Sequence, residues 1–315
     1  MGMSDIPKLA WVMAGIFGLL LIASLVAWAL SCRAGPQGPS LILRNLNQRI
    51  RAWWVMVGVM CACMALGSGA TLVLYSLLSA FALREFVTLT PTRRGDYWPL
   101  VACFYVALPL QYILIGMQWY GMFAIMLPVY GFLLLPVLAA LAGDTEHFLE
   151  RCAKIQWGLM LTVYCLSHVP ALLMLQGPTL GEHGFVLLLY LLLVVQLSDV
   201  LQYVCGKLWG KHLLAPRVSP SKTVEGLVGG GLGATLVGAA LYAMTPFSFG
   251  RALAISALIV ACGFFGGLAL SAVKRSLGAK DWGTMIEGHG GALDRLDSVV
   301  FAAPIFFHVV RWLYG

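Results

Sequence analysis

Long apolar segments, separated by short polar ones, run through this chain from beginning to end. A helix needs about 20 apolar residues to cross the hydrocarbon core of a bilayer, and most of these segments reach or approach that length. A membrane β-barrel would instead show short segments of alternating polarity, so the pattern favours helices. The predicted spans are residues 9–31, 98–118, 121–142, 155–176, 184–204, 224–245, 252–273 and 298–314.

Residues 53–83 form a longer apolar segment with Gly67-Ser68-Gly69 near its middle. The segment is too long for one span and short for two, and arginines flank both ends. Because basic flanks face the same side of a membrane, we expect a tight pair of short helices, with one long tilted helix as the alternative. The whole pattern predicts an all-α, polytopic integral membrane protein with about ten membrane helices, some of them short or broken.

The loops fix the orientation and divide the chain. Residues 32–52 carry four arginines and no acid, which places this loop in the cytoplasm and the N-terminus outside. The first apolar run is long and lacks a small-residue cleavage site, so we interpret it as an anchor rather than a removable signal peptide. We therefore distinguish an N-terminal anchor with its basic loop, residues 1–52, from a membrane domain, residues 53–315.

Composition supports this picture and excludes other classes. Sixty per cent of the residues are hydrophobic and only 10% are charged, whereas soluble domains carry about a quarter charged residues. The net charge of +7 lies in loops between spans, where it orients the protein and meets anionic headgroups, so it does not indicate a nucleic-acid partner. The eight cysteines are scattered, mostly in apolar segments, and predict buried packing.

Ionisable residues concentrate between Ser271 and Ser298, with an apolar segment on either side. So dense a group at a membrane edge is a functional-site hypothesis by default. Its members are Lys274, Arg275, Lys280, Asp281, Glu287, His289, Asp294, Arg295 and Asp297.

The acidic residues suggest a divalent cation. Asp294 and Asp297 are three residues apart, so on a helix they face the same way, and Mg²⁺ takes one or two carboxylates together with substrate phosphates. Asp199 lies at the end of an apolar span, where an unpaired carboxylate needs a cation, a metal or water. Two alternatives stay open: a solvated first helical turn for Asp294 and Asp297, and an ion pair with a loop lysine for Asp199.

The remaining polar residues suggest phosphate binding. Gly288-His289-Gly290-Gly291 precedes a predicted helix, where backbone N–H groups can approach an anion and His289 can donate to a phosphate or move a proton. Lys222, in the polar segment 219–226, stands free to meet a phosphate. The alternatives are topology-setting anchors for the basic residues, a buried turn for the glycines and helix capping for Thr223 and Glu225. Phosphoryl or nucleotidyl transfer is the reaction class that needs such a site.

The order of these residues resembles the signature of the phosphatidate cytidylyltransferases, also called CDP-diacylglycerol synthases. That signature is seen here as Ser271, Lys274-Arg275, Lys280-Asp281, Gly288-His289-Gly290-Gly291 and Asp294-Arg295-Leu296-Asp297. Ser219 to Gly226, and Asp199 ahead of Tyr203 and Gly206-Lys207, are similar to two further elements of the family. Arg84-Glu85-Phe86 and Gly143-Asp144-Thr145 are weaker matches, and the resemblance covers about residues 50–315.

The resemblance implies transfer of CMP from CTP to phosphatidic acid, giving CDP-diacylglycerol and pyrophosphate, with Mg²⁺ required and room for a second cation. It implies an enzyme of the bacterial inner (plasma) membrane with its site on the cytoplasmic side, and a homodimer is kept open. The expected catalytic residues are Asp294, Asp297, Lys274, Arg275 and His289. Those expected to bind phosphate or substrate are Ser219, Lys222, Thr223, Lys280, Gly290, Gly291 and Arg295, and those expected to hold metal are Asp199, Asp281, Asp294 and Asp297.

Two residues depart from the family pattern. Gly267 stands where many bacterial members carry an acid, and Glu287 stands where a proline is usual. The alternatives to the transferase are a CTP-dependent lipid or polyprenol kinase and, outside enzymes, a transporter of an anionic lipid. If Asp294 holds the metal, Asp294→Asn should abolish turnover and leave folding intact.

Overall fold

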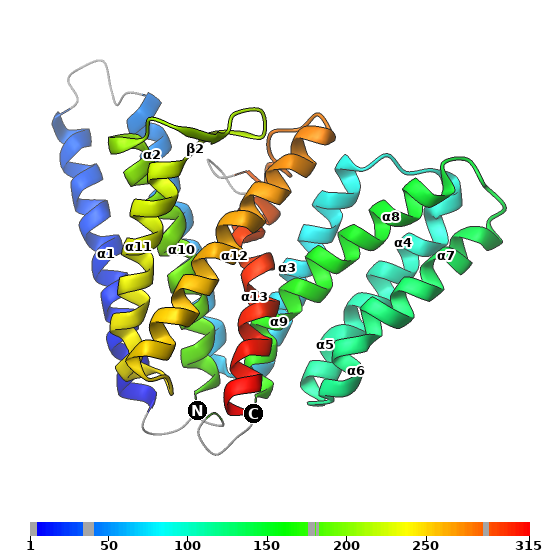
Figure 1. The fold of residues 1–315 in the computed structure, drawn as a ribbon, viewed down its shortest axis with the longest axis horizontal. Coiled ribbons are helices and arrows are strands. Elements are labelled where there is room, and N and C mark those ends of the chain that lie inside the picture. Colours follow the sequence, from blue (N-terminus) through cyan, green and yellow to red (C-terminus); the bar gives the residue numbers. More distant parts are fainter. Residues whose placement is uncertain (1–4, 34–40, 176–179, 181–182, 286–289) are drawn as a thin grey trace.

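The computed structural model describes residues 5–33, 41–175, 180, 183–285 and 290–315. Within these residues, ten helices are long and apolar enough to cross a membrane. The prediction of an all-α polytopic membrane protein with about ten membrane helices is thereby confirmed. Figure 1 shows these helices running up and down the molecule, with their connections gathered at the two ends.

The first three helices are α1 (Asp5–Arg33), α2 (Leu41–Leu66) and α3 (Ser68–Leu89). α2 and α3 meet at Gly67, whose φ of +102° lies in the region that glycine tolerates best. The predicted pair of helices is therefore present, but the prediction that both are short is wrong. Residues 41–52 and 84–89, which we had assigned to polar flanks, continue the helices, so that each of the two is long enough to span a membrane.

The three middle spans are each interrupted by a π-helical segment. Pro128 lies inside one such segment, where a missing N–H and a bulky ring disturb regular α-helical bonding. The first of the three middle spans follows the 3₁₀ turn η1 (Arg94–Asp96). It consists of α4 (Tyr97–Ala102), η2 (Cys103–Ala107) and α5 (Leu108–Gly116). The second consists of α6 (Tyr120–Ile125), η3 (Met126–Gly131) and α7 (Phe132–Leu141), and the third of α8 (Phe148–Leu159), η4 (Met160–Cys165), α9 (Leu166–Ala171) and η5 (Leu172–Met174).

Four α-helices, one 3₁₀ turn and one hairpin make up the rest of the described residues. They are α10 (Gly184–Trp209), β1 (Leu213–Ala215), β2 (Ser219–Thr223), α11 (Val224–Ala240) with η6 (Leu241–Met244), α12 (Phe249–Ser276) and α13 (Leu293–Tyr314). The antiparallel hairpin lies between the predicted spans 184–204 and 224–245, where we predicted no strands. Glycines bring α10 and α11 close together, because a methyl group on Gly230 would overlap the backbone of Gln202.

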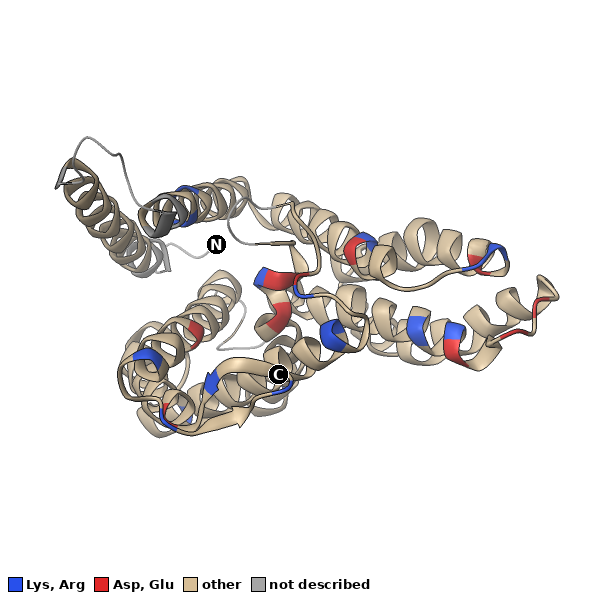
Figure 2. Ribbon diagram, turned by 90° about the horizontal axis from the view of Figure 1, so that it is seen from above, with Lys and Arg blue, Asp and Glu red and all other residues tan. Residues whose placement is uncertain are grey.

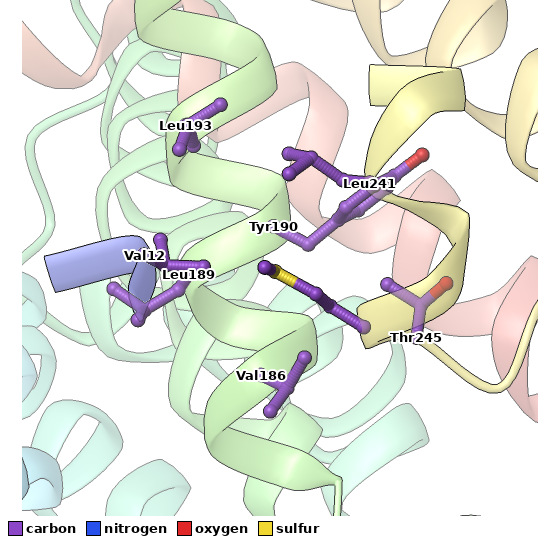
Figure 3. A pocket seen from close by; sticks show the side chains of 8 residues that line it. Val12, Val186, Leu189, Tyr190, Leu193, Leu241 and Thr245 are labelled. Atoms are coloured by element: carbon purple, nitrogen blue, oxygen red, sulfur yellow. The ribbon is translucent and has the colours of Figure 1, made fainter. Parts of the chain in front are cut away.

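The buried core lies among α3, α9, α10, α12 and α13, whereas α1 is mostly exposed and packs mainly beside α2. Figure 3 shows a small apolar pocket where Val12 of α1 faces Leu189 of α10, close to Leu241 of η6 and to Thr245, which follows η6. A helix with so little buried surface is suited to contact lipid along most of its length.

The polar connections that matter for function lie at one end of the bundle. The β-hairpin, the C-terminal end of α12, the C-terminal end of α3 and the turn before α8 all lie at the upper end in Figure 1, and α13 ends at the opposite one. Figure 2 looks onto this end of the bundle. Its charged residues, acidic and basic together, form one group near the molecule's centre and further groups toward its edges.

Candidate active site

The hairpin delivers Lys222 to the interior of the bundle. The Glu225 carboxylate accepts hydrogen bonds from the backbone N–H groups of Lys211 and His212 and contacts His212 Nδ1 at 2.6 Å. The Thr223 hydroxyl caps α11 by accepting a hydrogen bond from the Gly226 N–H at 3.0 Å. These contacts fix both ends of the hairpin to α11, so the strand between them places Lys222 against α12.

Lys222 lies in a mixed environment that stays partly open. Its Nζ donates to the Phe264 carbonyl at 3.2 Å and lies 4.6 Å from the centroid of the Phe264 ring. Burial lowers the pKa of Lys222 from its ordinary value, and Asp297 and Asp199 partly oppose that shift. The ammonium group is thus held where it loses water and is compensated by two carboxylates.

Gly267 forms the floor on which three polar side chains converge. A methyl group built on it would lie 3.0 Å from Lys222 Nζ, 3.3 Å from Ser298 Oγ and 4.0 Å from Asp297 Oδ2. These atoms come from β2 and α13, while Gly267 itself belongs to α12. The departure at Gly267 therefore lies inside the site, where a carboxylate would reach the same ammonium and a third acidic group would join Asp199 and Asp297.

Asp199 and Asp297 are linked through one residue, Ser298. Ser298 Oγ donates to Asp199 Oδ1 at 3.1 Å, and the Ser298 N–H donates to Asp297 Oδ1 at 2.8 Å. Among the described residues, neither Asp199 Oδ2 nor Asp297 Oδ2 accepts a hydrogen bond. We call Asp199 and Asp297 the carboxylate pair, since each keeps one oxygen available to a ligand.

Asp294, one turn earlier on α13, is bound on all sides. Its Oδ1 accepts a hydrogen bond from Lys274 Nζ at 2.6 Å, and its Oδ2 accepts from the N–H groups of Trp282 at 2.7 Å and Gly291 at 2.9 Å. Asp294 and Lys274 are each only 8% exposed. We call these four residues the loop anchor, because they fasten the segment between α12 and α13 to the ends of both helices.

The loop anchor also explains a glycine. Gly290 has a φ of +82°, and a methyl group on it would lie 2.8 Å from Asp294 Oδ2. Any larger residue would be strained and would push the carboxylate away from the two N–H groups. The requirement for glycine here comes from the approach of Asp294.

Glu85, from the first half of the chain, occupies the N-terminus of α13. Its two carboxylate oxygens accept hydrogen bonds from the N–H groups of Ala292 and Leu293, both at 2.9 Å. A carboxylate there satisfies otherwise unpaired N–H groups and matches the positive end of the helix dipole. Gly291 has no room for a methyl group beside this carboxylate, and Phe86 stacks on Trp282 with ring centroids 5.3 Å apart.

The sequence did not indicate this role of Glu85, because Arg84-Glu85-Phe86 showed only a resemblance to a family element. Its partners lie 207 and 208 residues away along the chain, and no local spacing could indicate them. The backbone N–H groups that we expected to offer to a phosphate at Gly291 and beyond are taken by Asp294 and Glu85.

The other predicted residues take different positions. Arg275, Lys280 and Asp281 are exposed, and Arg275 donates to the carbonyls of Val218 and Ala279. Arg295 is half-buried, and its Nε is a buried donor without an acceptor among the described residues. Ser219 begins β2. His289, with Glu287 and Gly288, lies outside the described residues.

No cluster of three or more His, Cys, Asp or Glu side chains among the described residues is arranged to hold a metal ion. The carboxylate pair offers two acidic groups, and Lys222 stands beside them. Such a set suits a cation that takes its other ligands from substrate phosphates and water, as Mg²⁺ usually does. Unpaired carboxylate oxygens, an ammonium and an orphaned guanidinium N–H together suit a polyphosphate bound with a cation.

Known proteins give an independent comparison. The model of the cytidylyltransferase family matches residues 47–313. An Escherichia coli (strain K12) protein titled "Uncharacterized protein YnbB" is 37% identical over 311 residues, covering 95% of this chain and 97% of that protein. A phosphatidate cytidylyltransferase of Staphylococcus saprophyticus is 37% identical over 158 residues, 49% of this chain and 60% of the relative. One from Staphylococcus haemolyticus is 39% identical over 124 residues, 39% of this chain and 48% of the relative.

Proposed function

This chain belongs to the cytidylyltransferase family, and from that premise we propose that it transfers CMP from CTP to phosphatidic acid, releasing pyrophosphate and forming CDP-diacylglycerol. The observation that carries the proposal is the convergence of Lys222 Nζ, Ser298 Oγ and Asp297 Oδ2 around Gly267 in a membrane protein. We choose phosphatidic acid as the acceptor because of the relatives named phosphatidate cytidylyltransferase. The match covers 60% of the length of the first of them.

In this proposal a phosphate oxygen of phosphatidic acid attacks the α-phosphorus of CTP, and the bond from that phosphorus to the pyrophosphate oxygen breaks. The nucleophile is already an anion, so positioning and charge neutralisation contribute more than proton removal. Lys222 Nζ and Arg295 Nε hold phosphate oxygens. The Arg295 Nε proton has no acceptor among the described residues, which is the condition expected of a donor reserved for a ligand.

We further propose Mg²⁺ as the cofactor, held by Asp199 and Asp297 through their free oxygens. When bound, the ion would neutralise charge on the triphosphate and on the leaving pyrophosphate. Ser298 keeps both carboxylates oriented by contacting one oxygen of each. Asp281 is exposed and lies outside this pair, and Asp294 has its oxygens in use, so we assign the metal to Asp199 and Asp297.

Asp294, Lys274 and Arg275 then act by holding the loop rather than by touching phosphates. Lys274 and Asp294 neutralise each other inside the loop anchor. Arg275 ties the end of α12 to the hairpin through the Val218 carbonyl. We further propose that Lys280, Gly290 and His289 contact the nucleotide from the aqueous side.

The site faces the cytoplasm in this proposal. The hairpin and the α12–α13 connection lie at one end of the bundle in Figure 1, and the loop 206–223 is basic without an acid. Loops of that kind stay on the cytoplasmic side of a membrane. We propose the bacterial inner membrane as the location, where both CTP and the lipid acceptor reach this end. A homodimer also stays part of the proposal.

The decisive experiment uses purified protein in detergent with Mg²⁺, phosphatidic acid, and CTP labelled separately at the α- and γ-phosphates. We expect the α-label in lipid and the γ-label in pyrophosphate. Movement of the γ-label into lipid would establish a CTP-dependent lipid kinase in place of the transferase. If neither label enters phosphatidic acid or any of a panel of other lipid phosphates, the proposal fails, and vesicle transport of the same lipids becomes the assay.

A further inference from the structure

An aromatic ring lies against the ammonium group of Lys222. Phe264 belongs to α12 and is only 2% exposed. Lys222 Nζ lies 4.6 Å from the centroid of its ring and donates to its carbonyl at 3.2 Å. The electron-rich face of an aromatic ring attracts a cation within about 6 Å of the centroid, and the attraction is stronger where water is excluded. Phe264 therefore holds Lys222 in two ways, through a backbone acceptor and through its ring.

Lys222 does not form an ion pair with the carboxylate pair. Among the described residues, its Nζ donates only to the Phe264 carbonyl, and no oxygen of the carboxylate pair lies within ion-pair distance of it. Lys274 differs, because its Nζ contacts Asp294 Oδ1 at 2.6 Å. Two lysines thus approach aspartates that lie one turn apart on α13, and only Lys274 is neutralised by direct contact.

Lys222 and Asp297 lie on either side of a position that has no side chain. A methyl group on Gly267 would lie 3.0 Å from Lys222 Nζ and 4.0 Å from Asp297 Oδ2. Opposite charges in a partly buried site attract each other strongly. An ion pair would occupy the ammonium and the free oxygen of Asp297 together, and neither would remain for a ligand. The contacts that oppose this pairing are those of Lys222 with Phe264.

We propose that Phe264 is a positioning residue whose ring keeps the Lys222 ammonium off the carboxylate pair. The pair then stays free for a divalent cation, and the ammonium stays free for a phosphate of the substrate. This inference rests on the proposed function, which assigns those two ligands to these groups. The ring acts only through Lys222, so its removal should weaken the binding of a cation and of an anion at once.

The first test compares Phe264→Leu with the wild type, because leucine keeps the backbone carbonyl and removes the ring face. The purified protein in detergent is titrated with Mn²⁺, without nucleotide or lipid, and bound ion is measured by electron paramagnetic resonance. We expect Mn²⁺ to bind about tenfold more weakly, as for the loss of a desolvated cation–π contact. The KM for CTP should rise by a similar factor, with a smaller change in kcat.

Phe265→Leu is the matched control. Phe265 is the next residue along α12, is 56% exposed and meets the Phe264 ring edge-on, with centroids 5.5 Å apart. Its ring makes no cation–π contact with Lys222 in the described part of the chain. Mn²⁺ binding and the KM for CTP should therefore stay at their wild-type values in this variant.

A second series keeps the size of the buried ring, since a smaller side chain also disturbs packing. Phenylalanines with one, two and three fluorine atoms are placed at position 264, where fluorine withdraws electron density from the ring face. Mn²⁺ binding should weaken step by step along this series. Lys222→Met gives the complementary test: in that background Phe264→Leu should leave Mn²⁺ binding unchanged, because no ammonium remains to compete for the carboxylate pair.

A fluorine series without a trend would overturn the proposal, and so would an equal loss from Phe264→Leu with and without Lys222. A wild-type protein that binds no Mn²⁺ would overturn it as well. CMP transfer is measured separately. If the wild type transfers no CMP but the Lys222-dependent loss of Mn²⁺ binding is found, the transferase assignment fails and the positioning role stands. If CMP is transferred and that loss is absent, the positioning role alone fails.

Discussion

Asp294 and Asp297 lie three residues apart on α13, yet their surroundings differ in kind. Asp294, in the loop anchor, receives an ammonium and two backbone N–H groups and has no oxygen to spare. Asp297, in the carboxylate pair, accepts from Ser298 on one oxygen and keeps the other open toward Lys222 and Gly267. The two acids of one motif thus differ in role: Asp294 holds the loop in place, and Asp297 keeps one oxygen open to a ligand.

The difference lies in hydrogen-bond saturation. A buried carboxylate whose oxygens are all used is a structural element, and breaking its ion pair leaves an uncompensated charge. A buried carboxylate with a free oxygen beside a cation is unstable by itself and gains from a ligand. Each variant below either changes one of these two centres or tests how they are supported.

The largest expected effect is on the carboxylate pair. Asp297→Asn should reduce kcat on the order of a thousandfold, because one charged ligand of the proposed cation is lost while the Ser298 contact can persist. The melting temperature should stay close to that of the wild type, as measured by intrinsic fluorescence in detergent. Activity within tenfold of the wild type would remove Asp297 from the reaction.

The second variant changes Asp294, for which we expect a loss of stability, whereas for Asp297 we expect a loss of kcat. Asp294→Asn should destabilise the protein by about 3–5 kcal/mol, because Lys274 is left buried and unpaired. The expectation from the sequence, loss of turnover with folding intact, is thereby replaced by loss of stability that carries activity down with it. A double-mutant cycle with Lys274→Met should show strong coupling between the two residues. Independent effects in that cycle would contradict the loop anchor.

A variant of Glu85 tests how α13, the helix that carries both Asp294 and Asp297, is held in place. Glu85→Gln should cost about 0.5–2 kcal/mol, because one amide oxygen replaces two carboxylate oxygens at the N-terminus of α13. The KM for CTP should rise as α13 moves relative to Lys222, with a smaller change in kcat. Glu150→Gln, on the exposed surface of α8, is the control and should leave both melting temperature and KM unchanged. Identical behaviour of the two variants would show that Glu85 holds nothing in place.

The smallest expected effect concerns pH. The pKa of Lys222 is lowered by burial, so its ammonium loses a proton at lower pH than a free lysine, and phosphate binding should weaken as pH rises through that value. Arginine stays charged throughout, so Lys222→Arg should move the alkaline limb of kcat/KM to higher pH. The maximal rate should fall, because Gly267 leaves little space there. Superimposable alkaline limbs would exclude Lys222 as the titrating group.

Much of the fold followed from local properties of the sequence. Hydropathy alone indicated the ten spans, and Gly67 with its neighbours indicated the break between α2 and α3. Span ends were less predictable, because residues 41–52 are polar enough to be taken for a loop although they are helical. The hairpin was missed because Pro220 and the flanking charges obscure so short a pair of strands.

The sequence predicted which residues gather at the candidate site better than it predicted how they contact one another. Spacing placed Asp294 and Asp297 on one side of a helix, but it could not show that the oxygens of one were already taken by Lys274 and Trp282. Asp199 was predicted as a site residue because a carboxylate in an apolar segment needs a polar partner, and Ser298 is one such partner. Glu85 needed the three-dimensional fold, since its bonds cross 207 residues of sequence.

Glu85 also has a consequence for the order in which the molecule is made. During synthesis α3 enters the membrane before α13 exists. The Glu85 carboxylate therefore lacks the backbone N–H groups that donate to it until α13 has been made. Helices inserted earlier can settle around one another, but neither centre can form until α13 arrives and docks. Nascent chains at every earlier stage therefore lack both the carboxylate pair and the loop anchor, which can form only after α13 has been inserted.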